Sequence, residues 1–288
     1  MQTWVYLVII YGILMAVLNI FKKKALTKST IIEVLWAYSL FSFLFVSFEF
    51  NSAMQLEVKY IFFAFLKAIC MFASWILGAQ ALNKLPISLH GVLNLSRIIF
   101  STIWGVIFLN EKLGVMQILG MLIVIVGLGL VNLKSNKDEN GEVKNNKIRF
   151  KYVLIMIISC VFATISGLSD IILMKNMESG QLQFWAMLFI TILYTVYSIV
   201  KRERISIKNI SKNYWIIFLA ICLIVGDRAL FAACAMPESK LSVMALIKQT
   251  GVIVTVLVGG KVFKEKNILY RFFCALIALS GIALVVMS

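Results

Sequence analysis

Apolar stretches of about twenty residues alternate with short polar segments along the whole chain. About twenty apolar residues in an α-helix span the hydrocarbon core of a bilayer. The pattern therefore predicts an all-α polytopic membrane protein with ten transmembrane helices, whose boundaries are set to within about two to four residues. The predicted helices cover residues 3–21, 31–50, 60–82, 87–109, 114–131, 150–174, 182–200, 214–236, 239–262 and 268–287.

The segment 79–131 recurs without a gap as 233–285, a shift of 154 positions. An apolar composition inflates chance matches among Ile, Leu, Val and Ala, so the polar and glycine matches are the informative ones. These matches are Ser88/Ser242, Gly105/Gly259, Glu111/Glu265, Lys112/Lys266 and Gly127/Gly281. The repeat predicts two related halves, 1–131 and 150–288, joined by a polar linker at 132–149. In a membrane chain such a repeat is typical of a transporter whose site lies where the halves meet.

Each half contains five predicted helices, an odd number, so the halves are expected to have inverted topology around a central cavity. Lys and Arg are concentrated in alternate loops, and the other face carries only Lys59, Lys112, Lys175 and Lys240. The positive-inside rule then predicts that the basic loops are cytoplasmic and that both termini lie outside. The first apolar stretch lacks a basic start and a cleavage site, which favours a retained helix over a signal peptide. We expect a bacterial cytoplasmic membrane location.

Composition excludes several classes of protein. With 61% hydrophobic residues the chain lacks the polar surface of a soluble protein, and its net charge of +15 resides mostly in short loops. The charge therefore indicates membrane orientation, and no nucleic acid partner is expected. The five cysteines lie in apolar stretches without CxxC spacing, so neither disulfides nor a metal site are predicted. No catalytic motif is present, and we expect no enzyme activity and no cofactor.

Small residues recur two turns apart on the last predicted helix of each half. Gly120 and Gly127 lie on the fifth helix, and Cys274 and Gly281 lie on the tenth. Small residues at this spacing let helix backbones approach closely, so we interpret these as packing positions.

Six charged residues fall inside apolar stretches: Lys67, Arg97, Asp170, Asp227, Arg228 and Lys248. A charge at the centre of a lipid-exposed helix costs roughly 2.5–3.5 kcal/mol on insertion scales. Such residues are therefore expected to face either an internal partner or a watery cavity. Internal pairing is favoured most for Lys67 and Asp170, because these two lie nearer the helix ends.

Arg97 and Lys248 each lie eleven residues beyond a proline that precedes the helix, Pro86 or Pro237. Both are therefore expected near the middle of the bilayer. In repeat register Lys248 matches Asn94, which lies one helical turn from Arg97 on the same face. The two halves thus direct a cation toward one shared cavity.

Asp227 and Arg228 lie at a similar depth on the eighth helix. Neighbouring residues point about 100° apart, so one of them can pair with Lys248 while the other faces elsewhere. An Asp227–Lys248 pair leaves Arg97 and Arg228 without an obvious anion in the protein. A cationic surplus of this kind favours a carboxylate or phosphate supplied by a ligand. Trp75 is expected near the depth of Arg97, and Tyr11 and Trp104 are further candidates to stack against a planar ligand.

The Glu-Lys turns at 108–112 and 262–266, each followed by a glycine-bearing helix, resemble the EamA-type branch of the drug/metabolite transporter superfamily. The resemblance covers nearly the whole chain. It implies a basket of helices around a central cavity, alternating access between inverted halves, and efflux or uptake of small metabolites, often amino acids. It supplies no binding residues, so the predicted site rests on the charges.

The leading hypothesis is a secondary transporter for a small anionic or zwitterionic metabolite, with amino acids as the default class. Arg97, Arg228 and Lys248 bind the anionic group in this hypothesis, and Asp227 contacts an amine. Asn94, Trp75 and Lys67 complete the predicted site. Three alternatives remain: a flippase for a lipid-linked sugar or phosphate, a proton-coupled exporter of cationic drugs that uses Asp170 or Asp227, and a non-transporting scaffold. The partners expected are a small metabolite and the lipid bilayer, and the chain is either a monomer or a homodimer.

Overall fold

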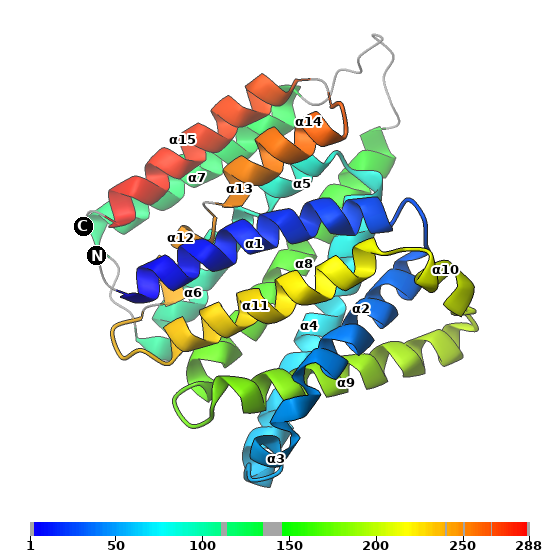
Figure 1. Ribbon diagram of the computed structural model, residues 1–288. Coiled ribbons are helices and arrows are strands. Elements are labelled where there is room, and N and C mark those ends of the chain that lie inside the picture. Colours follow the sequence, from blue (N-terminus) through cyan, green and yellow to red (C-terminus); the bar gives the residue numbers. More distant parts are fainter. Residues whose placement is uncertain are drawn as a thin grey trace.

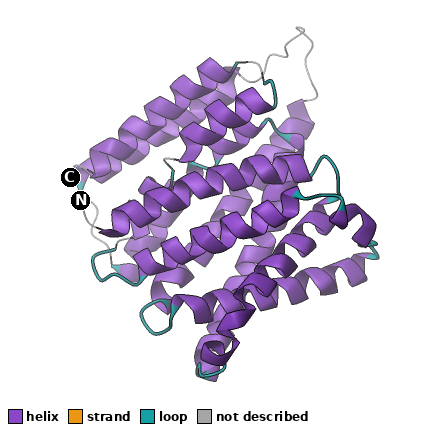
Figure 2. Ribbon diagram, viewed as in Figure 1, coloured by secondary structure: helices purple, strands orange, loops and turns teal. Residues whose placement is uncertain are grey.

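The computed structural model describes residues 3–110, 114–134, 146–239, 241–249, 251–265 and 267–286. Within these ranges the regular structure is helical and contains no strand (Figure 2). Seven helices are long and apolar enough to cross a membrane: Thr3–Ala25, Ile31–Ala53, Val58–Lys84, Ile87–Leu109, Phe150–Leu173, Ser179–Lys201 and Trp215–Cys234. This confirms an all-helical chain with several membrane-spanning segments. The count of ten spanning helices stays a prediction.

Each stretch predicted to be a helix contains helix, in places divided into shorter pieces. The first half consists of α1 (Thr3–Ala25), α2 (Ile31–Val46), η1 (Ser47–Glu49), α3 (Phe50–Ala53), α4 (Val58–Lys84), α5 (Ile87–Leu93), α6 (Ser96–Leu109) and α7 (Val115–Lys134). The second consists of α8 (Asn146–Leu173), α9 (Ser179–Lys201), α10 (Ile207–Ser211), α11 (Trp215–Cys234), α12 (Leu241–Lys248), α13 (Gly251–Val254), η2 (Thr255–Gly259), α14 (Gly260–Val262) and α15 (Ile268–Val286).

The described residues leave out part of the sequence pattern. The predicted linker at 132–149 overlaps the end of α7 and the start of α8, and positions 135–145 lie outside the described residues. Glu111, Lys112 and Lys266 of the repeated Glu-Lys turns also lie outside them, whereas Glu265 lies within.

The principal helix contacts join the two halves of the chain. α1 lies along α11, α4 along α8, α2 along α9, and α7 along α15 (Figure 1). If the halves are exchanged in repeat order, the α1–α11 pair becomes the α8–α4 pair, and the other two pairs map onto themselves. Neither half is therefore packed as a separate unit, and the space between the halves lies at the centre of the bundle.

Two helices predicted to be continuous are interrupted. The predicted helix 87–109 is divided into α5 and α6 at Asn94 and Leu95, where the backbone tightens to i→i+3 bonds such as Leu95 N to Val92 O, 3.0 Å. The predicted helix 239–262 is divided after Lys248, and η2 within it is a π-helix. Lys248 aligns with Asn94 in the repeat, so both halves are interrupted at equivalent positions. Hydrophobic periodicity does not register such a break, because the apolar pattern continues across it.

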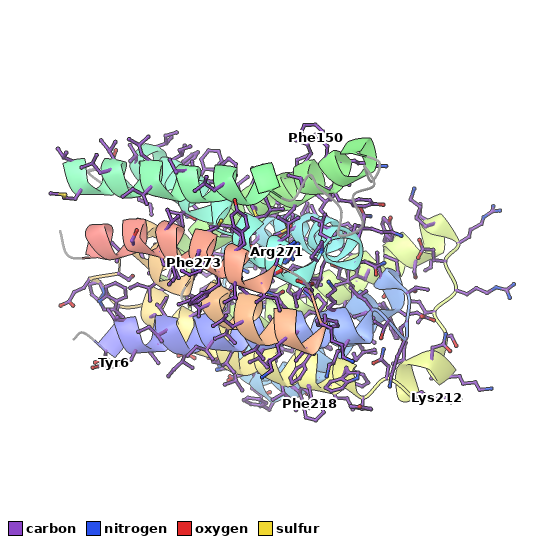
Figure 3. All side chains as sticks on the ribbon, turned by 90° about the horizontal axis from the view of Figure 1, so that it is seen from above. Tyr6, Phe150, Lys212, Phe218, Arg271 and Phe273 are labelled. Atoms are coloured by element: carbon purple, nitrogen blue, oxygen red, sulfur yellow. The ribbon has the colours of Figure 1, made fainter. Side chains whose placement is uncertain are left out.

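Large apolar side chains cover the perimeter of the bundle. Phe150 is 63% exposed, and Phe218 and Tyr6 are about half exposed; all three lie at the edges of the molecule in Figure 3. Lys212, in contrast, extends from one end. An apolar perimeter with a basic end is expected for a helical bundle whose solvent is a bilayer.

Candidate functional site

A cavity of about 190 Å³ lies between the halves. A single buried water needs only about 10–15 Å³, so the space exceeds that of an isolated water site. Its walls come from α1, α2, α4, α5 and α6 of the first half and from α8, α11 and α12 of the second. The cavity is thus lined by helices from both halves of the chain, the arrangement expected of a site at a repeat interface.

Four cations and two acids line this cavity: Lys22, Lys67, Arg97, Lys248, Asp170 and Asp227. Lys67 and Asp170 form an ion pair of 3.1 Å, with side chains that are 2% and 8% exposed. The Lys67 ammonium also contacts the Met71 sulfur at 2.8 Å and lies 5.6 Å from the centre of the Phe231 ring. The internal pairing favoured for Lys67 and Asp170 is therefore confirmed, and their charges offset each other.

Arg97 and Lys248 both line the cavity, and neither forms an ion pair with another described residue. The Nε atom of Arg97 is buried without a hydrogen-bond partner. The Lys248 ammonium lies 5.4 Å from the centre of the Tyr11 ring, a cation–π contact. Two cations from opposite halves thus face the same space, and no acid of the described ranges pairs with either.

Lys22 is the third cation in the cavity, after Arg97 and Lys248, that has no ion pair with a described residue. It follows the predicted helix 3–21 and was therefore expected in a loop. The run of three lysines is typical of a helix end, but α1 continues to Ala25 and buries Lys22. Its ammonium lies 5.3 Å from the Tyr38 ring centre and 5.5 Å from that of Trp75. The sequence contains one pattern that could have placed Lys22 in the cavity. Tyr11, Asn19 and Lys22 recur at helical spacing and so share one face of α1, and all three line the cavity.

Asp227 lines the cavity but is not within ion-pair distance of Lys248 in the described part of the chain. Outside the Lys67–Asp170 pair, the described cavity lining therefore contains three cations, Lys22, Arg97 and Lys248, and one acid, Asp227. Buried charges without partners are unfavourable in a low-dielectric interior. A ligand with an anionic group lowers that cost directly.

Most of the predicted site residues lie on this cavity, and one does not. Asn94, Trp75, Lys67, Asp170, Asp227, Arg97 and Lys248 all line it. Arg228 instead lies off the cavity, and its guanidinium donates to Glu49 at 2.6 Å and to Gln183 at 2.6 Å. The expectation that Arg228 has no anion within the protein is wrong, because the turn after α2 brings Glu49 to it. Trp104 also lies off the cavity, and its Nε1 donates to Thr164.

The helix interruptions border the same space. Asn94 lies in the α5–α6 break and Lys248 at the end of α12, and both line the cavity. Interrupted helices at the repeat interface are a recurrent construction of transporter binding sites, since irregular backbone is tolerated inside a membrane where it lines a cavity. His90 on α5 is also buried against the cavity, and its Nδ1 has no partner among the described residues.

A second charged cluster surrounds Glu265, in the loop before α15. Its carboxylate accepts from the backbone N–H groups of Ile87 at 2.5 Å and Ser88 at 3.2 Å, and from the Ser88 hydroxyl. Arg271 at 3.1 Å and Lys23 at 3.4 Å supply positive charge. Arg271 lies inside the bundle in Figure 3. Glu265 thus joins the start of α5 to α1 and α15.

Comparisons with known proteins bear on the family and the fold. The sequence model of the EamA-like transporter family matches residues 2–133, which confirms the resemblance to the EamA-type branch. A solved structure described as "Crystal structure of protein" aligns with 97% of this chain and 96% of its own, with a TM-score of 0.67 and 12% identity. At that identity the likeness shows the fold alone. No match was found among curated proteins. The family match covers less than half of the chain, and the seven apolar helices indicate a multi-pass membrane protein.

Proposed function

We propose that this chain is an EamA-type membrane transporter that moves a small anionic or zwitterionic metabolite across a cytoplasmic membrane, with amino acids as the default class. The observation that carries the proposal is the surplus of cations in the central cavity. In the described part of the chain, Lys22, Arg97 and Lys248 face it without ion pairs, and Asp227 is the single lining acid outside the Lys67–Asp170 pair.

A zwitterionic amino acid carries the charges that this lining would complement. In this proposal its carboxylate binds Arg97 and Lys248, which come from opposite halves and line the same cavity, and its ammonium binds Asp227. The rings of Tyr38 and Trp75, whose centres are 4.9 Å apart, form an aromatic wall beside Lys22. Such convergence of a few polar groups in a part-apolar pocket is characteristic of small-molecule sites.

Two features support alternating access between inverted halves. The cross-half helix pairs map onto each other when the halves are exchanged, and the interruptions at Asn94 and Lys248 occupy equivalent repeat positions. Motion of one half against the other then exposes a fixed site to one face at a time. The proposal includes ten spanning helices, repeats at 1–131 and 150–288, cytoplasmic basic loops and outside termini.

Flux into proteoliposomes of the purified protein tests the proposal. The panel holds neutral, acidic and basic amino acids, sugar phosphates and a lipophilic cation, each with and without a pH gradient. We expect uptake of acidic or zwitterionic solutes, and a fall of at least about a hundredfold in Arg97→Gln and Lys248→Gln, since each removes about 3 kcal/mol of a charge-assisted contact. Lys212→Gln, an exposed cation at the end of the bundle, is the matched control and is expected to retain full flux.

Three other outcomes would assign a different function. Flux of the lipophilic cation alone, driven by protons, indicates a drug exporter that uses Asp170 or Asp227. No flux of any soluble solute, together with transfer of a lipid-linked sugar across the membrane of the same vesicles, indicates a flippase. Silence toward both indicates a non-transporting membrane protein. Equal flux in the parent protein and in both cavity variants removes Arg97 and Lys248 from the site.

A further inference from the structure

One face of α8 forms a wall of the cavity. Ser159, Ala163, Gly167 and Asp170 follow one another at spacings of four, four and three residues, so they lie on one side of the helix. All four line the cavity. The wall therefore begins with small side chains and ends at the carboxylate that pairs with Lys67.

Gly167 leaves open space at this wall. A Cβ atom built on Gly167 meets no heavy atom within 4 Å. Gly78, on the facing helix α4, also lines the cavity, but a Cβ atom there would lie 3.0 Å from the Ser159 hydroxyl. The space beside Gly78 is thus already taken by the protein, whereas the space beside Gly167 belongs to the cavity.

The fold gives no reason of its own for a glycine at this position. Glycine inside a helix is less favourable than alanine because it loses more backbone freedom on folding. Close helix approach explains some glycines here: a Cβ on Gly251 would lie 2.0 Å from the carbonyl oxygen of Gly12. Gly167 has neither such a contact nor a positive φ angle. Its missing side chain changes only the volume of the cavity.

We propose that Gly167 determines the size of the substrate that the cavity accepts. The charged groups of the substrate lie at Arg97, Lys248 and Asp227, and its uncharged side chain lies against Gly167, one helical turn from Asp170. The ligand class is an amino or carboxylic acid with a bulky side chain, and larger residues at this position restrict the transporter to small acids. This inference rests on the proposed function and deepens it.

A homologous series of 2-amino acids tests the inference: glycine, alanine, leucine and phenylalanine, measured in proteoliposomes containing the parent protein, Gly167→Ala or Gly167→Val. We expect flux of leucine and phenylalanine to fall at least tenfold in Gly167→Val, because one misplaced methylene changes discrimination by about 10–200-fold. Flux of glycine and alanine stays within about twofold, and Gly167→Ala is intermediate. Ser169→Ala, on the same helix but off the cavity, is the matched control and keeps the parent selectivity.

Thermal unfolding separates a size effect from a folding defect. Because alanine favours a helix more than glycine does, the Tm of Gly167→Ala is expected to equal or exceed that of the parent while its flux of phenylalanine falls. Unchanged size selectivity in Gly167→Val, or an equal loss for all four acids, overturns the role of Gly167 and leaves the proposed function standing. If the parent carries none of the series, the size role of Gly167 fails, and the proposed function fails as well only if the parent also carries no other anionic or zwitterionic solute of the panel.

Discussion

Arg97 and Glu265 are both charged side chains held inside the bundle, and their surroundings differ. The Glu265 carboxylate accepts from two backbone N–H groups and a hydroxyl and lies within ion-pair distance of Arg271 and Lys23. Arg97 lines the cavity with a buried Nε that has no partner, and no described acid pairs with it. The charge of Glu265 is neutralised by neighbouring groups, whereas that of Arg97 is not paired with any described acid.

The contrast indicates two different uses of charge in one molecule. A carboxylate with several charge-assisted hydrogen bonds stabilises the junction it occupies, here the start of α5, the end of α1 and α15. A cation facing a cavity without an anion contributes little to stability and remains available for a ligand. Removing the charge of Glu265 should therefore lower stability more than transport, whereas removing the charge of Arg97 should lower transport more than stability.

The largest expected effect is on stability. Glu265→Gln removes the anion shared by Arg271 and Lys23, and breaking a buried pair from one side costs about 3–5 kcal/mol. We expect its Tm to fall steeply, as measured by thermal unfolding in detergent. Arg97→Gln removes a charge that has no partner, so its Tm should not fall. A Tm loss of equal size in both variants would show that Arg97 has a structural role and would erase the contrast.

A smaller effect is expected at the Lys67–Asp170 pair, which belongs to the cavity but is internally neutral. Lys67→Met and Asp170→Asn each leave one buried charge alone, whereas the double variant leaves none. A double-mutant cycle should therefore give a coupling energy of about 1–3 kcal/mol, with the double variant more stable than the sum of the singles predicts. If the losses of stability in the two single variants add up to the loss in the double variant, Lys67 and Asp170 do not interact.

The smallest effect is expected at Arg228, which lies off the cavity. Its side chain is 31% exposed and that of Glu49 is 20% exposed, and partly exposed pairs contribute about 0.2–1 kcal/mol. Arg228→Gln should lower the free energy of unfolding by no more than about 1 kcal/mol. Flux should stay within twofold of the parent. A loss of flux as large as that of Arg97→Gln would show that Arg228 takes part in substrate binding.

The sequence predicted the helical membrane architecture well, because apolar stretches of spanning length are a direct consequence of the bilayer as solvent. It also singled out Arg97 and Lys248 as candidates for one shared cavity, because the repeat aligns their helices, and both line the central cavity. Arg228 was misjudged because its partner, Glu49, sits in a short turn whose position depends on tertiary packing. Lys22 was missed because a lysine run at a helix end has the same appearance whether it faces water or a cavity.

The role of Glu265 was equally hidden. The repeated Glu-Lys turn was visible as a motif, but its partners, the amides of Ile87 and Ser88, lie more than 170 positions away in the chain. Backbone amides carry no side-chain signature, so no pattern of residue types marks them as the donors to Glu265. The helix interruptions were hidden for a similar reason, because hydrogen bonds of the backbone, and not residue types, define them.

The packing of α7 against α15 bears on how the chain is made. A Cβ atom on Gly281 would lie 2.5 Å from the carbonyl oxygen of Gly120, so the two backbones meet at this point, as the small-residue spacing predicted. α7 is translated long before α15, whereas the partners of α1, α2 and α4, which are α11, α9 and α8, all precede α15 in the chain. The surface of α7 that packs on α15 therefore stays uncovered after the other three pairs have their partners. Assembly is stepwise, and a nascent chain that stops before α15 leaves α7 without its principal partner.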